Sequence, residues 1–552
     1  MTTNDRRWRR RLLAAVLPLT LAAAACGGSD DGEQADAGQV KDQLVVAWTG
    51  DLNSMDPPFS LVEWNRELSV NVYEPLVRYK LVPQSDGSLT WDGLEVAPAL
   101  ATSWDVDGAS ITFHLRQGVK FHPSGNPLTA DDVKYSFERT VAVPGGFGAF
   151  NANLAGIFDP VKQVTVVDPA TVKISFTNAS GEPMLLPASL PSMRFPQFGI
   201  LDSKTVKSKA TADDPWAAKW LAENVAGTGP YYVAERTPNQ QTVLQAVPGY
   251  WGEQPEIKKV VLRVTSSADI VALMKGGDID LAASGLTPRA FDELDSSGYT
   301  VLNQPIPNIV SVHLATDDEA LADVRVRQAI AYAMPYDQIL KVALAGRGER
   351  AMSYVNPKSP GYVPAWEQYT TNVDKAKQLL AEAGVTGLTL PLFYDSGVVY
   401  NEDVALLVKD ALGQVGITVE ASPQPTTQFA EQRTARVKKA RSGQHGLLLS
   451  SSVIWLDDPD PSTDTPFKTG GSSNWTHYSN ATVDGLHAAH RFDPDPAARA
   501  AAYEQVQRTI ATDVPTIPLA ITGRTVALNP ALTGMSFTND SHTRFWTLGW
   551  KK

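Results

Sequence analysis

Few residues of this sequence have the types and spacing that enzymes use for catalysis. The 552 residues contain no Gly-x-Ser-x-Gly elbow that would present a nucleophilic serine. They also contain no Gly-x-x-x-x-Gly-Lys-Ser/Thr loop for phosphate, and Gly227-Thr228-Gly229 lacks the third glycine of a dinucleotide loop. The single cysteine, Cys26, follows an N-terminal apolar run. We therefore predict a protein that is not an enzyme and that needs no cofactor.

Histidine and carboxylate pairs are the remaining candidates for chemistry. His487 and His490 lie three residues apart on a predicted helix, a spacing that places two imidazoles on one face for a metal ion. Because no third histidine lies nearby, we interpret the pair as solvent-exposed and predict no metal site. The carboxylates at residues 131–132 open another predicted helix, where they favour the positive end of the helix dipole. The pair Asp457-Asp458 could act as an acid and a base or could bind a ligand, and its role stays open.

The N-terminal residues predict export. Five arginines between residues 6 and 11 precede an apolar run of 14 residues, which ends in small residues before Cys26. This order is typical of a secretory signal peptide, and the run is shorter than the roughly 20 apolar residues that span a bilayer. We predict that residues 1–25 are a signal peptide. Arg9-Arg10-Arg11 leaves the choice between general secretion and twin-arginine export open.

The residues around Cys26 predict a membrane anchor. Residues 21–29, Leu-Ala-Ala-Ala-Ala-Cys-Gly-Gly-Ser, resemble a bacterial lipoprotein signal, although Ala23 replaces the usual leucine. The resemblance implies that Cys26 is acylated. Residues 27–39 are rich in small and polar residues that bury too little apolar surface to fold. We expect residues 26–43 to be a lipidated flexible tether at the outer face of the cell membrane, periplasmic or extracellular.

The charge of the chain excludes one class of partner. The formal net charge is −12, and removal of residues 1–25, with five arginines and one aspartate, leaves about −16. Because such a surface repels phosphate backbones, we predict no nucleic-acid partner. No later segment is long and apolar enough to span a bilayer, so the lipid would be the membrane contact. The mature chain is large enough for several domains, and we expect a monomer.

The hydrophobic periodicity predicts an α/β protein, because strands and helices alternate along the chain. Strands are predicted at residues 44–48, 111–116, 260–264 and 417–420. Helices are predicted at residues 67–79, 268–275, 324–344, 375–383, 404–415 and 498–512. Thr129 and Asp132 predict a capping box at the start of a further helix.

Several segments, in order, carry a resemblance to one family. They include Asn-Val-Tyr-Glu-Pro-Leu-Val at 71–77, Phe-His-Leu-Arg-Gln-Gly-Val-Lys-Phe-His at 113–122, Leu-Thr-Ala-Asp-Asp-Val at 128–133, Gly-Thr-Gly-Pro-Tyr at 227–231, Pro-Gly-Tyr-Trp at 248–251, Asp-Val-Arg-Val-Arg-Gln-Ala-Ile at 323–330 and Thr-Ile-Pro-Leu at 516–519. Together they resemble the extracellular solute-binding proteins of the oligopeptide, dipeptide and nickel class, the receptors of ABC importers. The resemblance covers nearly the whole mature chain.

The resemblance implies a fold and a domain order. It implies a two-lobed α/β fold of the periplasmic-binding-protein type II-like kind, with an additional domain inserted in the first lobe. Lobe I would comprise residues 44–80, 225–308 and 513–552, the inserted domain residues 81–224, and lobe II residues 309–512. The implied partners are a peptide or small-molecule ligand, caught between the lobes, and the permease and ATPase subunits of the transporter.

The resemblance also implies ligand-binding residues. In peptide-binding relatives, an aspartate in a Trp-x-x-Asp-x-x-Asp/Glu-Pro run pairs with the ammonium group of the peptide. The run here is one residue shorter, so counting back from Asp460 selects Asp457, while counting forward from Trp455 selects Asp458. A carboxylate in a closed cleft would hold a cation strongly. Trp455 would supply a wall of the cleft or fill the core, and both readings stay open.

Other positions are weaker candidates. Residues Leu61, Val62 and Glu63 stand where relatives offer backbone groups to an extended peptide. Phe147 and Phe150 would line the cleft or anchor their own loop. Positions 451–452 are serines where some relatives carry a basic residue for the peptide carboxylate. The sequence therefore disfavours ligands with a fixed terminal carboxylate.

Three alternatives to a peptide receptor remain. The same fold would suit an oligosaccharide or another small solute, with tryptophan rings against sugar faces. Nickel is disfavoured, because only His445 and His477 lie near the expected cleft segments. From another class, the chain could be a secreted hydrolase or a peptide-sensing receptor. A hydrolase would need a nucleophile or metal that the sequence does not provide.

Overall fold

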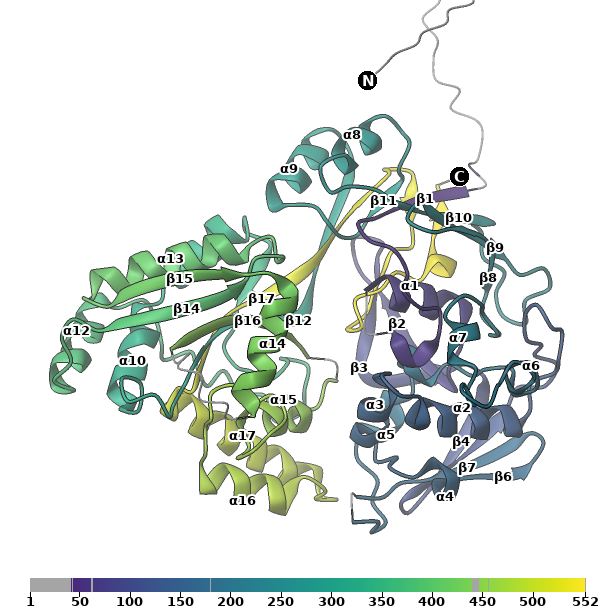
Figure 1. The fold of residues 1–552 in the computed structure, drawn as a ribbon, viewed down its shortest axis with the longest axis horizontal. Helices are drawn as coiled ribbons and strands as arrows, with labels where there is room; N and C mark the ends of the chain where they lie inside the picture. Colours follow the sequence, from purple (N-terminus) through teal and green to yellow (C-terminus); the bar gives the residue numbers. More distant parts are fainter. Residues whose placement is uncertain are drawn as a thin grey trace, which may run out of the picture. The chain divides into compact units, whose positions relative to one another are not determined.

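The computed structural model describes residue 41 and residues 43–60, 63–178, 180–438, 446–454 and 456–551. Residues 1–40, which hold the predicted signal peptide and most of the predicted tether with Cys26, lie outside these residues, as do Leu61, Val62 and Trp455. Gln43, the predicted end of the tether, is instead the first residue of strand β1. The chain is an α/β protein in which one large sheet is flanked by helices and accompanied by smaller sheets (Figure 1). No helix among the described residues combines the length and the apolar character that crossing a membrane requires.

The large sheet has 11 strands and runs in the order β15-β14-β16-β12-β17-β11-β1-β10-β9-β8, with β13 paired to β17. The bounds are β1 Gln43–Trp48, β8 Tyr231–Thr237, β9 Gln241–Ala246, β10 Lys259–Val264, β11 Leu281–Ala282, β12 Thr300–Leu314, β13 Gly348–Arg350, β14 Thr389–Asp395, β15 Thr418–Gln424, β16 Leu447–Val453 and β17 Thr516–Leu528. The long strands β12 and β17 pair antiparallel from Thr300↔Leu528 to His313↔Thr516. They join the two ends of the sheet, as Figure 1 shows.

Helices α10 to α17 lie at one end of the large sheet, and we call this end the C-terminal lobe, residues 309–513. Its helices are α10 Val324–Ala333, α11 Tyr336–Gln338, α12 Val373–Glu382, α13 Asn401–Gln414, α14 Thr426–Val437, α15 Pro459–Phe467, α16 Ala481–His490 and α17 Pro496–Asp513, with a π-helical turn η3 at Ile339–Ala343. Apolar residues of β12, β14, β16 and β17 and of the helices form one core here, including Val312, Trp366 and Leu447. Burying these side chains supplies most of the free energy that holds the lobe together.

A smaller sheet of four strands, in the order β4-β5-β7-β6, forms what we call the small-sheet region, residues 101–208. Its strands are β4 Ala101–Asp107, β5 Ser110–Leu115, β6 Val164–Asp168 and β7 Thr171–Ser175, and its helices are α2 Ala130–Ala142, α3 Gly148–Leu154, α4 Pro160–Gln163, α5 Ser189–Ser192, α6 Ser203–Ser208 and the 3-10 turn η2 Pro196–Phe198. Its core includes Phe113, Phe137 and Phe176. Leu456, from the C-terminal lobe, also belongs to this core.

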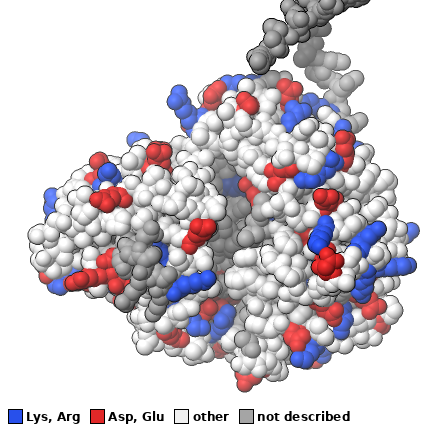
Figure 2. All heavy atoms as spheres, in the orientation of Figure 1, with Lys and Arg blue, Asp and Glu red and all other residues white. Residues whose placement is uncertain are grey.

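The remaining elements surround β1 and β8 to β11. They are η1 Pro57–Phe59, α1 Glu63–Val72, β2 Val77–Pro83, β3 Leu89–Pro98, α7 Ala218–Leu221, α8 Ile270–Lys275, α9 Pro288–Ser296, β18 Leu532–Thr533, β19 Ser536–Phe537, η4 Phe545–Thr547 and β20 Gly549–Trp550. Two apolar cores lie here, one on each face of β1, because alternate strand residues point to opposite faces. Acidic and basic side chains are interspersed over the face that Figure 2 shows.

Most of the predicted elements are confirmed within a few residues, and the capping box of Thr129 and Asp132 is present at α2. Two helix predictions are wrong, each because of a proline. The helix predicted at residues 67–79 ends at Val72, and the chain becomes strand β2 after Pro75. The helix predicted at residues 324–344 breaks at Met334, which precedes Pro335 and has ψ of 134°. Proline disfavours helical geometry in the residue before it.

Candidate ligand-binding site

A cavity of about 390 Å³ lies where the small-sheet region meets the C-terminal lobe, and we call it the aromatic cavity. Its apolar lining is Phe147, Phe150, Leu154, Phe195, Tyr354, Val453, Ile454, Leu456, Pro461, Pro466 and Trp475. Its polar lining is Asn151, Ser192, Arg433, Ser451, Ser452, Ser462, Thr465 and Ser473. A concave, largely apolar site with a few polar groups is the usual form of a small-ligand site.

Phe147 and Phe150, two predicted site residues, both line the aromatic cavity. Their rings lie 4.8 Å apart, and Phe150 is 40% exposed. Close backbone packing positions them: the amide of Phe147 donates to the carbonyl of Pro58 at 2.7 Å. A Cβ at Gly148 would lie 2.4 Å from the carbonyl oxygen of Thr140, so this position requires glycine. The two rings are thus held at the cavity by the start of α3, where Phe147 is the N-cap and Phe150 lies in the first turn.

Asp457 and Asp458, the predicted ammonium anchors, do not line either of the cavities described here. Asp458 is the N-cap of α15, where it accepts from the amide of Asp460 at 2.8 Å. It also forms a buried ion pair with Arg499, at 2.8 Å. The carboxylate of Asp458 therefore fixes the start of the helix that forms one wall of the aromatic cavity.

Asp457 faces the small-sheet side of the molecule. Its carboxylate accepts from Trp91 Nε1 at 2.7 Å and from the Asn356 side chain. The ammonium of Lys358 lies 3.7 Å from the centre of the Trp91 ring. Burial raises the pKa of Asp457, and the hydrogen bond from Trp91 and the charges of Arg194 and Lys358 oppose that shift. Asp457 thus links the loop before α15 to strand β3.

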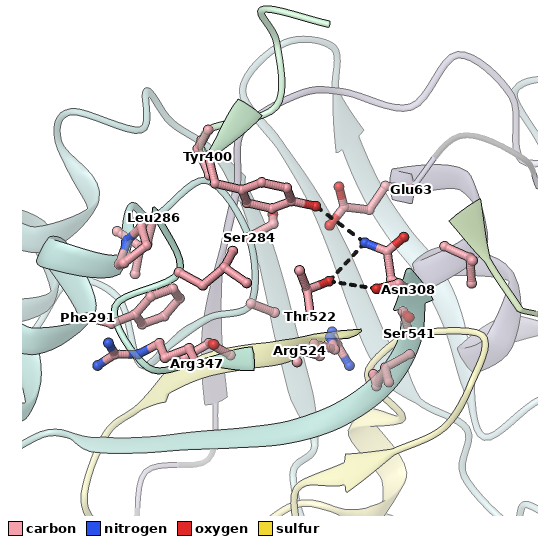
Figure 3. A pocket seen from close by; sticks show the side chains of 18 residues that line it. Glu63, Ser284, Leu286, Phe291, Asn308, Arg347, Tyr400, Thr522, Arg524 and Ser541 are labelled. Atoms are coloured by element: carbon pink, nitrogen blue, oxygen red, sulfur yellow. Dashed lines mark hydrogen bonds between the residues drawn. The ribbon is translucent and has the colours of Figure 1, made fainter. Parts of the chain in front are cut away.

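A second cavity, of about 400 Å³, lies beside β12 and β17, and we call it the polar cavity (Figure 3). The side chain of Asn308 donates to Thr522 Oγ1 at 3.0 Å and to Tyr400 Oη at 3.4 Å. Glu63 lines the same cavity as Tyr400 and Asn308, and Figure 3 labels all three. Val453 lines this cavity and the aromatic cavity, so the two adjoin there.

Glu63 is the only carboxylate among the described residues that line either cavity, and it is exposed to solvent. Protein groups nevertheless surround it. Desolvation and the neighbouring charge of Glu67 raise the pKa of Glu63 to about 6, against the attraction of Arg524. A carboxylate in this setting is ionised at neutral pH and is available to a cationic group of a ligand.

The prediction that His487 is solvent-exposed is wrong. Helix α16 packs against α17, and the imidazole of His487 is buried, with Nδ1 3.4 Å from Asp460 and 3.9 Å from Asp464. These three groups could each offer one ligand atom to a metal ion. The guanidinium of Arg491 already lies 3.1 Å from Asp460 and 3.7 Å from Asp464. Its positive charge compensates the carboxylates and disfavours a second cation.

Sequence reasoning did not find Arg433, Trp475, Asn308 and Tyr400 as lining residues. They come from α14, the loop before α16, β12 and the residue before α13. Arg433 is one turn after Phe429 on α14, a helix that the hydrophobic periodicity did not reveal. Only an indirect indication of Arg433 was available in the sequence: positions 451 and 452 are serines, so a cation in this part of the site would have to come from another segment.

Comparisons with known proteins agree on the fold. A family model described as bacterial extracellular solute-binding proteins, family 5 Middle, matches residues 95–474. The periplasmic binding protein DppA of Helicobacter pylori, solved in complex with the peptide STSA, superposes with a TM-score of 0.73 at 24% identity, covering 92% of this chain and 98% of that one. The α/β fold is therefore that of the periplasmic binding proteins, as the resemblance implied.

Two characterised relatives resemble the chain over most of its length. The dipeptide-binding protein of Escherichia coli strain K12 is 27% identical over 479 residues, which cover 82% of this chain and 84% of that protein. Heme-binding protein A of Haemophilus influenzae is 26% identical over 547 residues, which cover 93% and 94%. Since the family model spans more than half of the sequence, the chain belongs to the bacterial extracellular solute-binding proteins, family 5.

Proposed function

We propose that this protein is the peptide receptor of an ABC importer and that the peptide occupies the two adjoining cavities. Proteins of this family are transport receptors rather than enzymes. The observation that carries the proposal is that two cavities of different chemistry share Val453 in their linings. One cavity is aromatic, and the other has an exposed carboxylate. A short peptide offers an apolar side chain to the first and an ammonium group to the second.

Strand β16 supports the same placement. It ends at Val453, and Ile454 and Leu456 continue along the aromatic cavity. On the opposite side of the polar cavity, Glu63 opens α1 directly after residues 61 and 62. An extended peptide between these segments would gain main-chain hydrogen bonds regardless of its side chains. Such contacts suit a receptor that accepts a range of peptides.

Two predicted carboxylates compete with Glu63 for the peptide ammonium. Asp458 is committed to Arg499 and to the start of α15, so we propose a positioning role for it. Asp457 would meet a ligand only by exchanging its bonds to Trp91 and Asn356. Glu63, in contrast, lines the polar cavity and is exposed to solvent, and we therefore propose it as the first partner of the ammonium group.

The N-terminal part of the proposal concerns location and delivery. We propose that residues 1–25 direct export, that Cys26 carries a lipid, and that the residues between Cys26 and strand β1 tether the receptor to the outer face of the cell membrane. A tether of this length would raise the concentration of the loaded receptor near its permease and ATPase subunits. The receptor would act as a monomer.

Native mass spectrometry of the protein purified from an expression strain tests the ligand class. We expect masses of short peptides to accompany the folded protein, and we expect isothermal titration calorimetry to give saturable binding for members of a dipeptide and tripeptide panel. A ladder of hexose masses, or heme absorbance with no binding of any peptide in the panel, would contradict the proposal. Labelling with radioactive palmitate, compared between the wild-type protein and Cys26→Ala, tests the anchor.

A further inference from the structure

Among the described residues that line the aromatic cavity, one has a charged side chain, the guanidinium of Arg433. Arg433 lies on α14 and is half-buried. Its guanidinium carbon is 5.3 Å from the centre of the Phe429 ring and 5.2 Å from that of Trp475. Stacking on two rings restricts the plane of the guanidinium and leaves its N–H edge available for hydrogen bonds.

No described residue forms a hydrogen bond or an ion pair with Arg433. Desolvation lowers the pKa of Arg433, and Asp395 and Tyr354 act on it only through their charges. Asp395 itself accepts from the amide of Gly397 and from Thr426 Oγ1, both at 2.8 Å. A partly desolvated guanidinium without an anionic partner is unfavourable, so an anion that enters the cavity would gain a charge-assisted contact.

The arginines of the polar cavity differ from Arg433 in this respect. Arg347 donates to Asp292 at 2.6 Å, and Arg524 lies 3.6 Å from Glu67 and donates to Thr543 at 2.9 Å. Their charges are compensated inside the protein. Of the three arginines that line the two cavities, Arg433 alone lacks such a partner among the described residues.

The groups around Arg433 indicate what kind of anion would fit the aromatic cavity. Ser451 and Ser452 line the same cavity, and Ser452 Oγ accepts from Tyr354 Oη at 2.8 Å. The rest of the lining is mainly aromatic and aliphatic. We propose that Arg433 binds the terminal carboxylate of the peptide and that the aromatic cavity holds the apolar side chain of the same C-terminal residue. This inference rests on the proposed peptide-receptor function and adds to it the chemistry of one end of the ligand.

A comparison of acid and amide peptides tests the inference. The probes are Ala-Phe, Ala-Phe-amide and N-acetyl-Ala-Phe, and the affinities are measured by isothermal titration calorimetry for the wild-type protein and for Arg433→Gln. For the wild-type protein, we expect amidation to weaken binding at least tenfold. For Arg433→Gln, we expect the acid to bind at least tenfold more weakly than to the wild-type protein, and the acid and the amide to bind alike.

Lys438→Gln is the matched control, because Lys438 is exposed at the end of the same helix and does not line the cavity. We expect it to preserve the preference for the acid. Circular dichroism melting of Arg433→Gln checks that the variant is folded, and Arg433→Lys should retain part of the preference. Equal wild-type affinity for acid and amide would overturn the role of Arg433 while leaving peptide binding intact. Failure of all three probes and of every other peptide would instead overturn the proposed function.

Discussion

The two adjoining cavities differ in how their charges are compensated, although they have similar volumes of about 390 and 400 Å³. In the polar cavity, each arginine has a partner within the protein, and the exposed charge is the carboxylate of Glu63. In the aromatic cavity, the charge is a cation without a partner among the described residues. This difference supports the proposal that the site orients a ligand that is positive at one end and both negative and apolar at the other.

Removing the carboxylate that fixes the start of α15, a wall of the aromatic cavity, should have the largest effect, and it should be on the stability of the fold. Asp458→Ala leaves Arg499 buried without its partner and removes the N-cap of α15. Loss of one member of a buried ion pair costs about 3–5 kcal/mol, so we expect the free energy of unfolding to fall by about 3 kcal/mol or more. Chemical denaturation measures this change. Asp323→Ala, which removes the N-cap of α10 and a partly exposed ion pair with Arg325 but leaves no buried charge unpaired, should cost about 1 kcal/mol. Equal losses in the two variants would contradict the assigned role.

Removing the charge of the polar cavity should weaken binding without unfolding the protein. For Glu63→Gln we expect about tenfold weaker binding of peptides with a free ammonium group, equivalent to about 1.4 kcal/mol. The affinity for N-acetylated peptides should not change. Asp457→Asn is the informative comparison, because Asp457 is one of the two anchors that the sequence left open. A larger loss of affinity in Asp457→Asn than in Glu63→Gln would assign the ammonium to Asp457.

A smaller effect on affinity is expected from pH, because the carboxylate of the polar cavity titrates near neutral pH and the guanidinium of the aromatic cavity does not. The pKa of Glu63 is raised to about 6, so its carboxylate is largely ionised at pH 7.5 and largely protonated at pH 5.5. The attraction for a peptide ammonium is present above the pKa and is lost as the pH falls through it. We expect a weakening of roughly fourfold over this interval, following the ionised fraction. In Glu63→Gln, the affinity should be nearly constant, and a persistent pH dependence would indicate another titrating group.

Trimming the aromatic cavity should have the smallest effect. Phe150 is 40% exposed and contacts the Phe147 ring, so its truncation creates little buried void. We expect Phe150→Ala to weaken binding of Ala-Phe about threefold more than binding of Ala-Ala, with an unchanged melting temperature. A uniform loss for both peptides would show that Phe150 supports the loop rather than the ligand.

The sequence predicted the architecture better than the site. Runs such as residues 44–48 and the capping box of Thr129 and Asp132 encode their structure locally, so β1 and the start of α2 were predictable. The breaks at Pro75 and Pro335 were also locally encoded and were overlooked. The family and its fold followed from ordered motifs across the chain.

The site was harder to predict because its chemistry depends on long-range pairing. A carboxylate that is free in the sequence, such as Asp457 or Asp458, is buried against Trp91 or Arg499 in the fold. Conversely, nothing near Arg433 in the sequence indicates that it lies beside Trp475, 42 residues away. Burial and pairing decide which charged groups remain available, and neither can be read from spacing alone.

Leu456 has a consequence for attempts to alter the ligand range of this receptor. Its side chain lines the aromatic cavity and is also part of the core of the small-sheet region. Enlarging the cavity at this position would therefore remove packing from a folded core, at a cost of about 2–5 kcal/mol for a change to alanine. Engineering for bulkier peptides should begin at Phe150, where selectivity and folding are separate properties of the chain.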